Sequence, residues 1–125
     1  MVSPDDFKKK IKEVMRQGYQ VEFLGKDFDG ITAMLTETKA EKIYRWVEEV
    51  VKGKIQPIFI GSKKPYKGWM VNELLTFRYA FSSGNVEYRI LFVKVKSSVY
   101  IEFHLGDHKY YDKVRKDLDL KKTSY

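Results

Sequence analysis

Three β-rich segments follow one another in the C-terminal half of the chain, with only short turns between them. They run from Leu74 to Ser82, from Val86 to Val95 and from Ser98 to Leu105, and apolar residues recur in them with period two. Connections this short join antiparallel neighbours, because a parallel crossover needs a dozen residues or more. The segments therefore predict a three-stranded antiparallel meander, and the rest of the chain has to pack around it.

Helices are predicted before and after this meander. Pro4 suits the first position of a helix that Ser3 caps. Thr38 and Glu41 have the spacing of a capping box for a second helix, which ends at Gly53. A last helix begins near residue 108, where apolar side chains recur at three- and four-residue spacing.

The segment between the first two helices predicts a β-hairpin. Residues 19–23 and 31–33 alternate between polar and apolar side chains, and the residues around Lys26 to Gly30 suit the connecting loop. Residues 55–60 predict a short strand that Pro57 restricts to an edge or a bulge. We therefore expect one α+β domain over residues 1–125, with an antiparallel sheet, made of the meander and the N-terminal hairpin, packed against helices.

Several classes of protein are excluded by what the sequence lacks. No apolar run approaches the ~20 residues of a membrane span, and the N-terminal MVSPDDFKKK has no apolar core of a signal peptide. The chain has no cysteine and only two histidines, so neither disulfides nor a dedicated zinc site is expected. We expect a cytoplasmic protein with no membrane partner, no metal site and no cofactor.

The positive charge is concentrated in one part of the chain. The net charge is +7, and residues 54–100 contain eight basic residues against only Glu73 and Glu87. A local excess of this kind favours a polyanionic partner such as nucleic acid. The alternative is the lysine-rich surface of a heat-adapted protein, which the low count of five Asn and Gln residues also suits.

Three runs of residues carry a resemblance to a known family. They are Glu87–Phe92 (EYRILF), Val99–Phe103 (VYIEF) and Gly106–Asp112 (GDHKYYD). Over about residues 74–118 the chain resembles the RelE/ParE toxin superfamily, and the G-x-H-x-x-Y-D run is similar to its HigB-type branch. Members usually open with a strand and a helical hairpin, whereas this chain opens with a helix.

The resemblance implies a RelE-like fold and the toxin of a toxin–antitoxin pair. The RelE and HigB branches are endoribonucleases that cleave mRNA without metal, usually on the ribosome, whereas the ParE branch acts on DNA gyrase. The implied partners are RNA, including mRNA on the ribosome, and a cognate acidic antitoxin protein.

The same resemblance suggests the catalytic residues. Cleavage through the 2′-hydroxyl needs a base for that hydroxyl, cations at the phosphate oxygens and an acid for the 5′-oxygen. Arg89 matches the family's phosphate-contacting arginine, His108 is the candidate general acid or base, and Tyr111 is expected to orient the nucleotide or share the proton transfer. The residues expected to contact nucleic acid are Lys63, Lys64, Lys67, Arg78, Lys94 and Lys109.

Each candidate also has a purely structural interpretation. His108 can simply begin the last helix, Tyr111 can be a packing residue, and His104 in the middle of a strand is expected to be structural. The glutamates with which Arg89 can pair are Glu73, Glu87 and Glu102. Two other functions therefore stay open: a non-catalytic basic RNA- or DNA-binding module, and a degenerate toxin-like protein that serves protein–protein contact.

Overall fold

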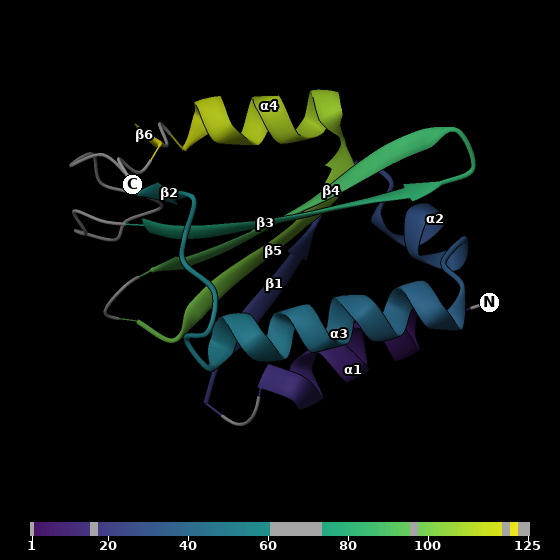
Figure 1. Ribbon diagram of the computed structural model, residues 1–125, viewed down its shortest axis with the longest axis horizontal. Helices are drawn as coiled ribbons and strands as arrows, with labels where there is room; N and C mark the ends of the chain where they lie inside the picture. Colours follow the sequence, from purple (N-terminus) through teal and green to yellow (C-terminus); the bar gives the residue numbers. More distant parts are fainter. Residues whose placement is uncertain (1, 16–17, 61–73, 96–97, 119–120, 123–125) are drawn as a thin grey trace.

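The computed structural model describes residues 2–15, 18–60, 74–95, 98–118 and 121–122 of the chain. Its elements are α1 (Pro4–Met15), β1 (Gln20–Leu24), α2 (Phe28–Ala33), α3 (Glu37–Val51), β2 (Phe59–Ile60), β3 (Leu74–Ser83), β4 (Val86–Val95), β5 (Tyr100–Asp107), α4 (His108–Asp117) and β6 (Lys121–Lys122). The sheet has the strand order β1-β5-β4-β3-β2-β6. Helices α1 and α3 lie against one face of this sheet, and α4 lies against the other (Figure 1).

The predicted meander is confirmed. Strands β3 and β4 pair antiparallel from Leu74 opposite Val95 to Ser83 opposite Val86, and β4 pairs antiparallel with β5. The turn between β3 and β4 contains Gly84 at a φ of 62°, a left-handed conformation that glycine adopts without strain. The α+β class is confirmed with it.

The predicted N-terminal hairpin is wrong. Strand β1 forms, but it pairs in parallel with β5, with Gln20 opposite Tyr100, so the sheet is mixed. The second half of the supposed hairpin is helix α2, in which Phe28, Ile31 and Thr32 are buried. Their spacing of three and four residues is that of one helical face, and the three-residue alternation at 31–33 was too short to exclude it.

Helices α1 and α3 cover one face of the sheet. In α1, the Ser3 hydroxyl accepts a hydrogen bond from the Asp6 amide at 3.2 Å, so the predicted cap is confirmed. Helix α3 begins two residues earlier than the capping box at Thr38 and Glu41 predicts, because Thr36 is the cap and accepts from the Lys39 amide at 3.2 Å. The large core on this side combines α1, α2 and α3 with the inner faces of β3, β4 and β5.

The opposite face of the sheet is also buried, under α4. A second apolar cluster joins Leu91, Val93 and Val95 of β4 to Tyr111 and Val114 of α4. Strand β4 is therefore covered on both faces, which explains its unbroken apolar run from residue 90 to residue 93. Because α4 crosses this face, it divides the polar side chains of the sheet into two groups.

The remaining strands are short. Of the strand predicted at residues 55–60, Phe59 and Ile60 form β2, which pairs with β3 at Thr76 and with β6. Residues 61–73, which follow β2, lie outside the described residues. Among the described helices, none combines the length and the apolarity needed to cross a membrane.

Candidate functional site

The start of α4 organises the candidate site. Strand β5 passes directly into α4 at His108, where the helix was predicted to begin, and the Asp107 side chain caps it by accepting from the Tyr110 amide at 2.9 Å. The ring of Tyr110 packs closely on Gly106. A Cβ atom added at position 106 would lie only 2.6 Å from the Cδ2 atom of Tyr110. This close packing fixes the direction in which the first turn leaves the sheet.

Two arginines and one histidine surround the ring of Tyr111 on one side of α4. Arg89 and Arg78 extend from β4 and β3 on the same face, and their Cζ atoms lie 5.1 and 6.0 Å from the centroid of the Tyr111 ring. The ring of His108, one turn earlier on the helix, lies 6.4 Å from it. We call Arg78, Arg89, His108 and Tyr111 the arginine cluster. The structure thus brings together all three predicted catalytic residues.

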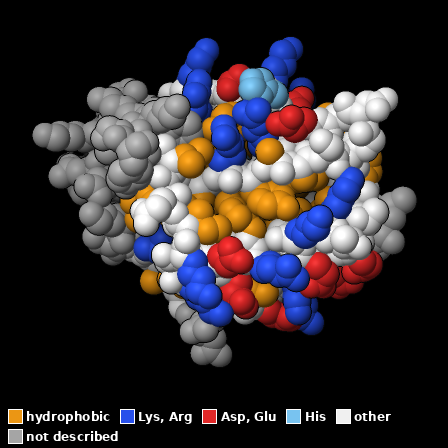
Figure 2. Space-filling model, viewed as in Figure 1, with side chains coloured by type: hydrophobic (Ala, Val, Ile, Leu, Met, Phe, Trp, Pro, Cys, Tyr) orange, Lys and Arg blue, Asp and Glu red, His pale blue; other side chains and the backbone are white. Residues whose placement is uncertain are grey.

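The members of the arginine cluster differ in their charged contacts. Arg89 pairs with Glu87, and its Nη2 and Nε atoms each lie 3.2 Å from Glu87 Oε1. Glu87 is one of the three glutamates that the sequence offered as partners of Arg89. His108 Nε2 lies 3.2 Å from Asp112 Oδ2. Within the part of the chain that the structure describes, no carboxylate lies within ion-pair distance of Arg78. Figure 2 shows Lys and Arg side chains around a histidine at the surface over α4.

Tyr111 supports the arginines through its ring. It is only 3% exposed, and its hydroxyl is buried without a hydrogen-bond partner among the described residues. A guanidinium above an aromatic face gains a cation–π attraction of about 0.5–2 kcal/mol. The tyrosine therefore holds the guanidinium groups in place, whereas its hydroxyl is too enclosed to contact a substrate in this arrangement.

The other predicted contacts are distributed differently. Lys109 is exposed in the first turn of α4, on the side of the turn away from the cluster. Lys94 lies on the opposite face of β4, because the pleat places it with Phe92 beside a cavity of about 370 Å³ under α3. The structure therefore does not bring Lys94 to the cluster. Lys63, Lys64 and Lys67 lie outside the described residues.

A buried polar chain lies on the other side of α4, and the sequence did not predict it. His104 is 6% exposed and Glu102 is 1% exposed. His104 Nε2 lies 2.8 Å from Glu102 Oε1, and His104 Nδ1 lies 2.9 Å from the Tyr110 hydroxyl. The Tyr100 hydroxyl continues the chain, 2.7 Å from Glu102 and 2.6 Å from Glu22. We call these five residues the polar chain.

The chemistry of the polar chain follows from its donors and acceptors. A carboxylate only accepts hydrogen bonds, so the Nε2 proton of His104 points at Glu102, and Nδ1 is left to accept from Tyr110. Burial, together with the charge of Glu102, raises the pKa of Tyr110 to about 12. Burial, with hydrogen bonds to Glu22 and Glu102, also raises the pKa of Tyr100. Both hydroxyls therefore keep their protons at neutral pH.

The signal for the polar chain was present in the sequence. Tyr100, Glu102 and His104 alternate on one face of β5, opposite the apolar residues Ile101, Phe103 and Leu105. The apolar stripe of α4, with Tyr111 and Val114, requires a surface to cover, and the nearest one is the face of the strand that precedes it. The structural role expected for His104 agrees with its burial and its two partners.

Alkaline titration gives a first prediction. Burial and nearby acidic groups raise the pKa of Tyr44 to about 12, as for Tyr110. The folded protein then binds more protons than the unfolded chain between pH 10 and 12, so the free energy of unfolding should fall as pH rises through this window. Urea denaturation at stepped pH should show a shallower fall for the Tyr44→Phe, Tyr110→Phe double variant. Equal slopes for the two proteins would contradict the assignment.

Comparison of the chain with protein-family models, curated proteins and solved structures found no match. The candidate site therefore rests on its own geometry. Among the described residues, no group of three or more His, Asp or Glu side chains is arranged to hold a metal ion.

Proposed function

We propose that the protein is an endoribonuclease that binds RNA at the arginine cluster and cleaves it by attack of the 2′-hydroxyl. One observation carries this proposal: two guanidinium groups share the ring of Tyr111, and among the described residues Arg89 has a carboxylate partner whereas Arg78 has none. Two adjacent cations with one carboxylate favour an anion between them. The planar fork of a guanidinium matches the oxygens of a phosphodiester.

The residues of the cluster supply the parts that the reaction needs. The 2′-oxygen forms a bond to phosphorus, the bond from phosphorus to the 5′-oxygen breaks, and a 2′,3′-cyclic phosphate and a 5′-hydroxyl result. Arg89 and Arg78 stabilise the charge that develops on the phosphate oxygens. His108, 64% exposed and next to them, takes the proton of the 2′-hydroxyl or gives one to the 5′-oxygen.

The resemblance to the HigB-type branch supports the same proposal. It adds that the RNA is mRNA on the ribosome, that the reaction needs no metal, and that an acidic antitoxin in the cytoplasm restrains the protein. The basic composition of residues 54–100 agrees with a polyanionic substrate.

A cleavage assay tests the proposal. Free RNA and ribosome-bound mRNA are each incubated with the protein, with and without EDTA. We expect cleavage of at least one substrate that survives the chelator, because arginines rather than a metal ion stabilise the transition state. Substitution of 2′-deoxynucleotides should abolish cleavage, since the nucleophile is removed. Cleavage of the deoxy substrate, or activity that EDTA abolishes and magnesium restores, would contradict the mechanism.

A second candidate is a non-catalytic nucleic-acid-binding module. One observation favours it: the Nε2 atom of His108 is already engaged by Asp112. In that case the same cluster holds a phosphate without transferring a proton. Tight, salt-dependent RNA binding without cleavage of either substrate would select this function.

A further inference from the structure

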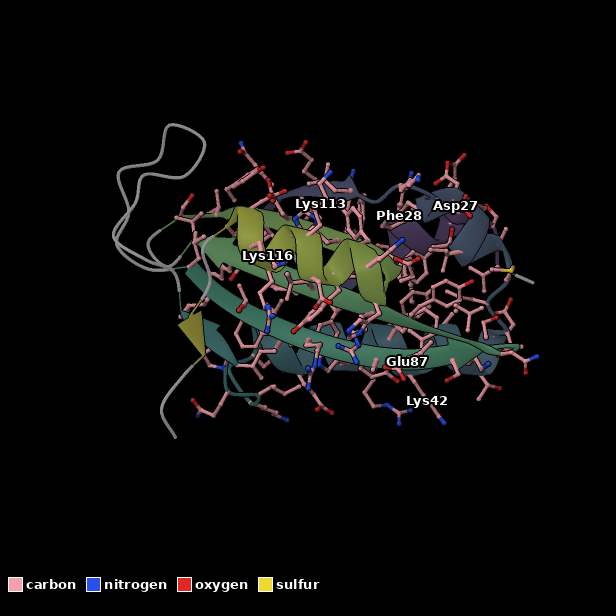
Figure 3. All side chains as sticks on the ribbon, turned by 90° about the horizontal axis from the view of Figure 1, so that it is seen from above. Asp27, Phe28, Lys42, Glu87, Lys113 and Lys116 are labelled. Carbon is pink, nitrogen blue, oxygen red and sulfur yellow. The ribbon has the colours of Figure 1, made fainter. Side chains whose placement is uncertain are left out.

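A cavity of about 760 Å³ lies on the other side of the first turn of α4 from the arginine cluster. Its walls come from α2, the start of β4, the end of β5 and α4. Three lysines line it, Lys26, Lys109 and Lys113, together with Tyr88 and Tyr110. Figure 3 shows Asp27 and Lys113 on one side of α4 and Glu87, the partner of Arg89, on the other.

The three lysines are available for a ligand. Within the described residues none of them forms an ion pair. Of the two carboxylates that line the cavity, Asp107 caps α4 by accepting from the Tyr110 amide, and Asp27 lies against Gly30 without capping α2. Three ammonium groups against two carboxylates around one opening favour an anion.

Tyr110 forms the wall between this cavity and the polar chain. Together with Lys113 it also lines a smaller cavity of about 230 Å³, whose other walls include Glu102 and His104. Its hydroxyl is held by His104 Nδ1 at 2.9 Å, and its ring is packed on Gly106. The lysine-lined cavity therefore has one rigid wall, held in place by hydrogen bonding and by packing.

The cavity adjoins the arginine cluster through the sheet. Tyr88 precedes Arg89 on β4, and Gly106 lies directly opposite Arg89 on β5. Both Tyr88 and Gly106 line the cavity. The cavity therefore begins beside the backbone of Arg89, and the first turn of α4 lies between its lysines and the two guanidinium groups.

We propose that this cavity is a second phosphate site, which holds a phosphate group of the RNA strand adjacent to the one at the arginine cluster. The proposal rests on the proposed function for the identity of the strand. The anion-binding property of the cavity rests on its own lysines.

The salt dependence of RNA binding tests the proposal. Each phosphate contact of a single strand contributes about 0.7 to the slope of log K against log salt. Because the cavity holds one phosphate, the triple variant Lys26→Gln, Lys109→Gln, Lys113→Gln should lower the slope by about 0.7. The control triple Lys9→Gln, Lys10→Gln, Lys42→Gln removes the same charge from exposed positions on α1 and α3. It should leave the slope nearly unchanged. Equal effects of the two triples would overturn the proposal, because only the overall charge would then matter.

A second probe separates failure of the cavity from failure of the proposed function. Inorganic pyrophosphate is titrated into the wild-type protein and into the cavity triple, and amide shifts of residues 109–113 are followed by NMR. If RNA does not bind but pyrophosphate shifts these amides only in the wild type, the RNA function is wrong and the anion site stands. If RNA binds, but the cavity triple keeps the salt slope of the wild type and pyrophosphate does not shift these amides in the wild type, the cavity proposal is wrong and the RNA function stands. No response to either probe overturns both.

Discussion

Replacing Arg89 with alanine is expected to slow RNA cleavage by about 100- to 1,000-fold, the cost of removing one preorganised donor from a developing oxyanion. Its guanidinium lies 5.1 Å from the Tyr111 centroid and cannot be replaced by Arg78, which lies on the neighbouring strand. RNA affinity should fall as well, because a phosphate contact is lost. Arg45→Ala is the matched control, since this arginine is exposed on α3 at the opposite face of the sheet.

His108→Ala should separate catalysis from binding. Proton transfer is worth ~100- to ~10,000-fold in rate, whereas a neutral imidazole adds little to phosphate attraction, so affinity should stay near that of the wild type. Each variant is checked by circular dichroism before cleavage and binding are measured separately. If Arg89→Ala and His108→Ala both cleave at the wild-type rate, the site assignment is wrong, and the GDHKYYD run only begins a helix.

The second large effect concerns stability. Glu102→Ala should lower the free energy of unfolding by about 1–3 kcal/mol, because it leaves the buried Nε2 proton of His104 without an acceptor. The side chain is 1% exposed, and its two oxygens lie within 2.8 Å of His104 and Tyr100. Glu102→Gln keeps the volume and one acceptor, so it should cost less and remain measurable if the alanine variant does not fold. Glu13→Ala, at an exposed position of α1, should change stability by less than about 0.5 kcal/mol.

Urea denaturation of a double-mutant cycle measures this pair directly. The combined Glu102→Ala, His104→Ala variant should lose less stability than the sum of the losses of the two single variants. Each single variant leaves one buried polar side chain without its partner, whereas the double variant removes both side chains. We expect a coupling energy within about 0.5–3 kcal/mol. Additive effects would show that the 2.8 Å contact contributes nothing to stability.

The parts of the fold that depend on local pattern could be predicted from the sequence. The bounds of β4 agree with the alternation that predicts them, and the start of α4 agrees with the three- and four-residue spacing of apolar side chains. The pairing of β1 with β5 could not be predicted, because no local pattern relates Gln20 to Tyr100. Helix α2 was missed for a different reason: a segment of six residues holds too few apolar positions to distinguish a period of two from one of 3.6.

The candidate site, too, could be predicted only in part. Arg89, His108 and Tyr111 were selected by the resemblance, and the structure brings them together. The position of Lys94 was predictable, because side chains two residues apart on a strand point to the same face. Lys94 therefore lies on the same face as Phe92 of the core, and Arg89 lies on the other face. The burial of Glu102 and His104 was harder to predict, since it depends on α4 folding back over the strand from which it emerges.

The place of β5 in the sheet also has a consequence for synthesis. This strand lies between β1, near the beginning of the chain, and β4, which immediately precedes it. Until residues 100–107 have left the ribosome, β1 has no strand to pair with and the inner edge of β4 is open. The N-terminal helices can form earlier, but the sheet on which they pack is completed only after β5 has been translated. A nascent chain stalled before β5 therefore exposes two unpaired edges, which are the parts of a β protein most prone to aggregate.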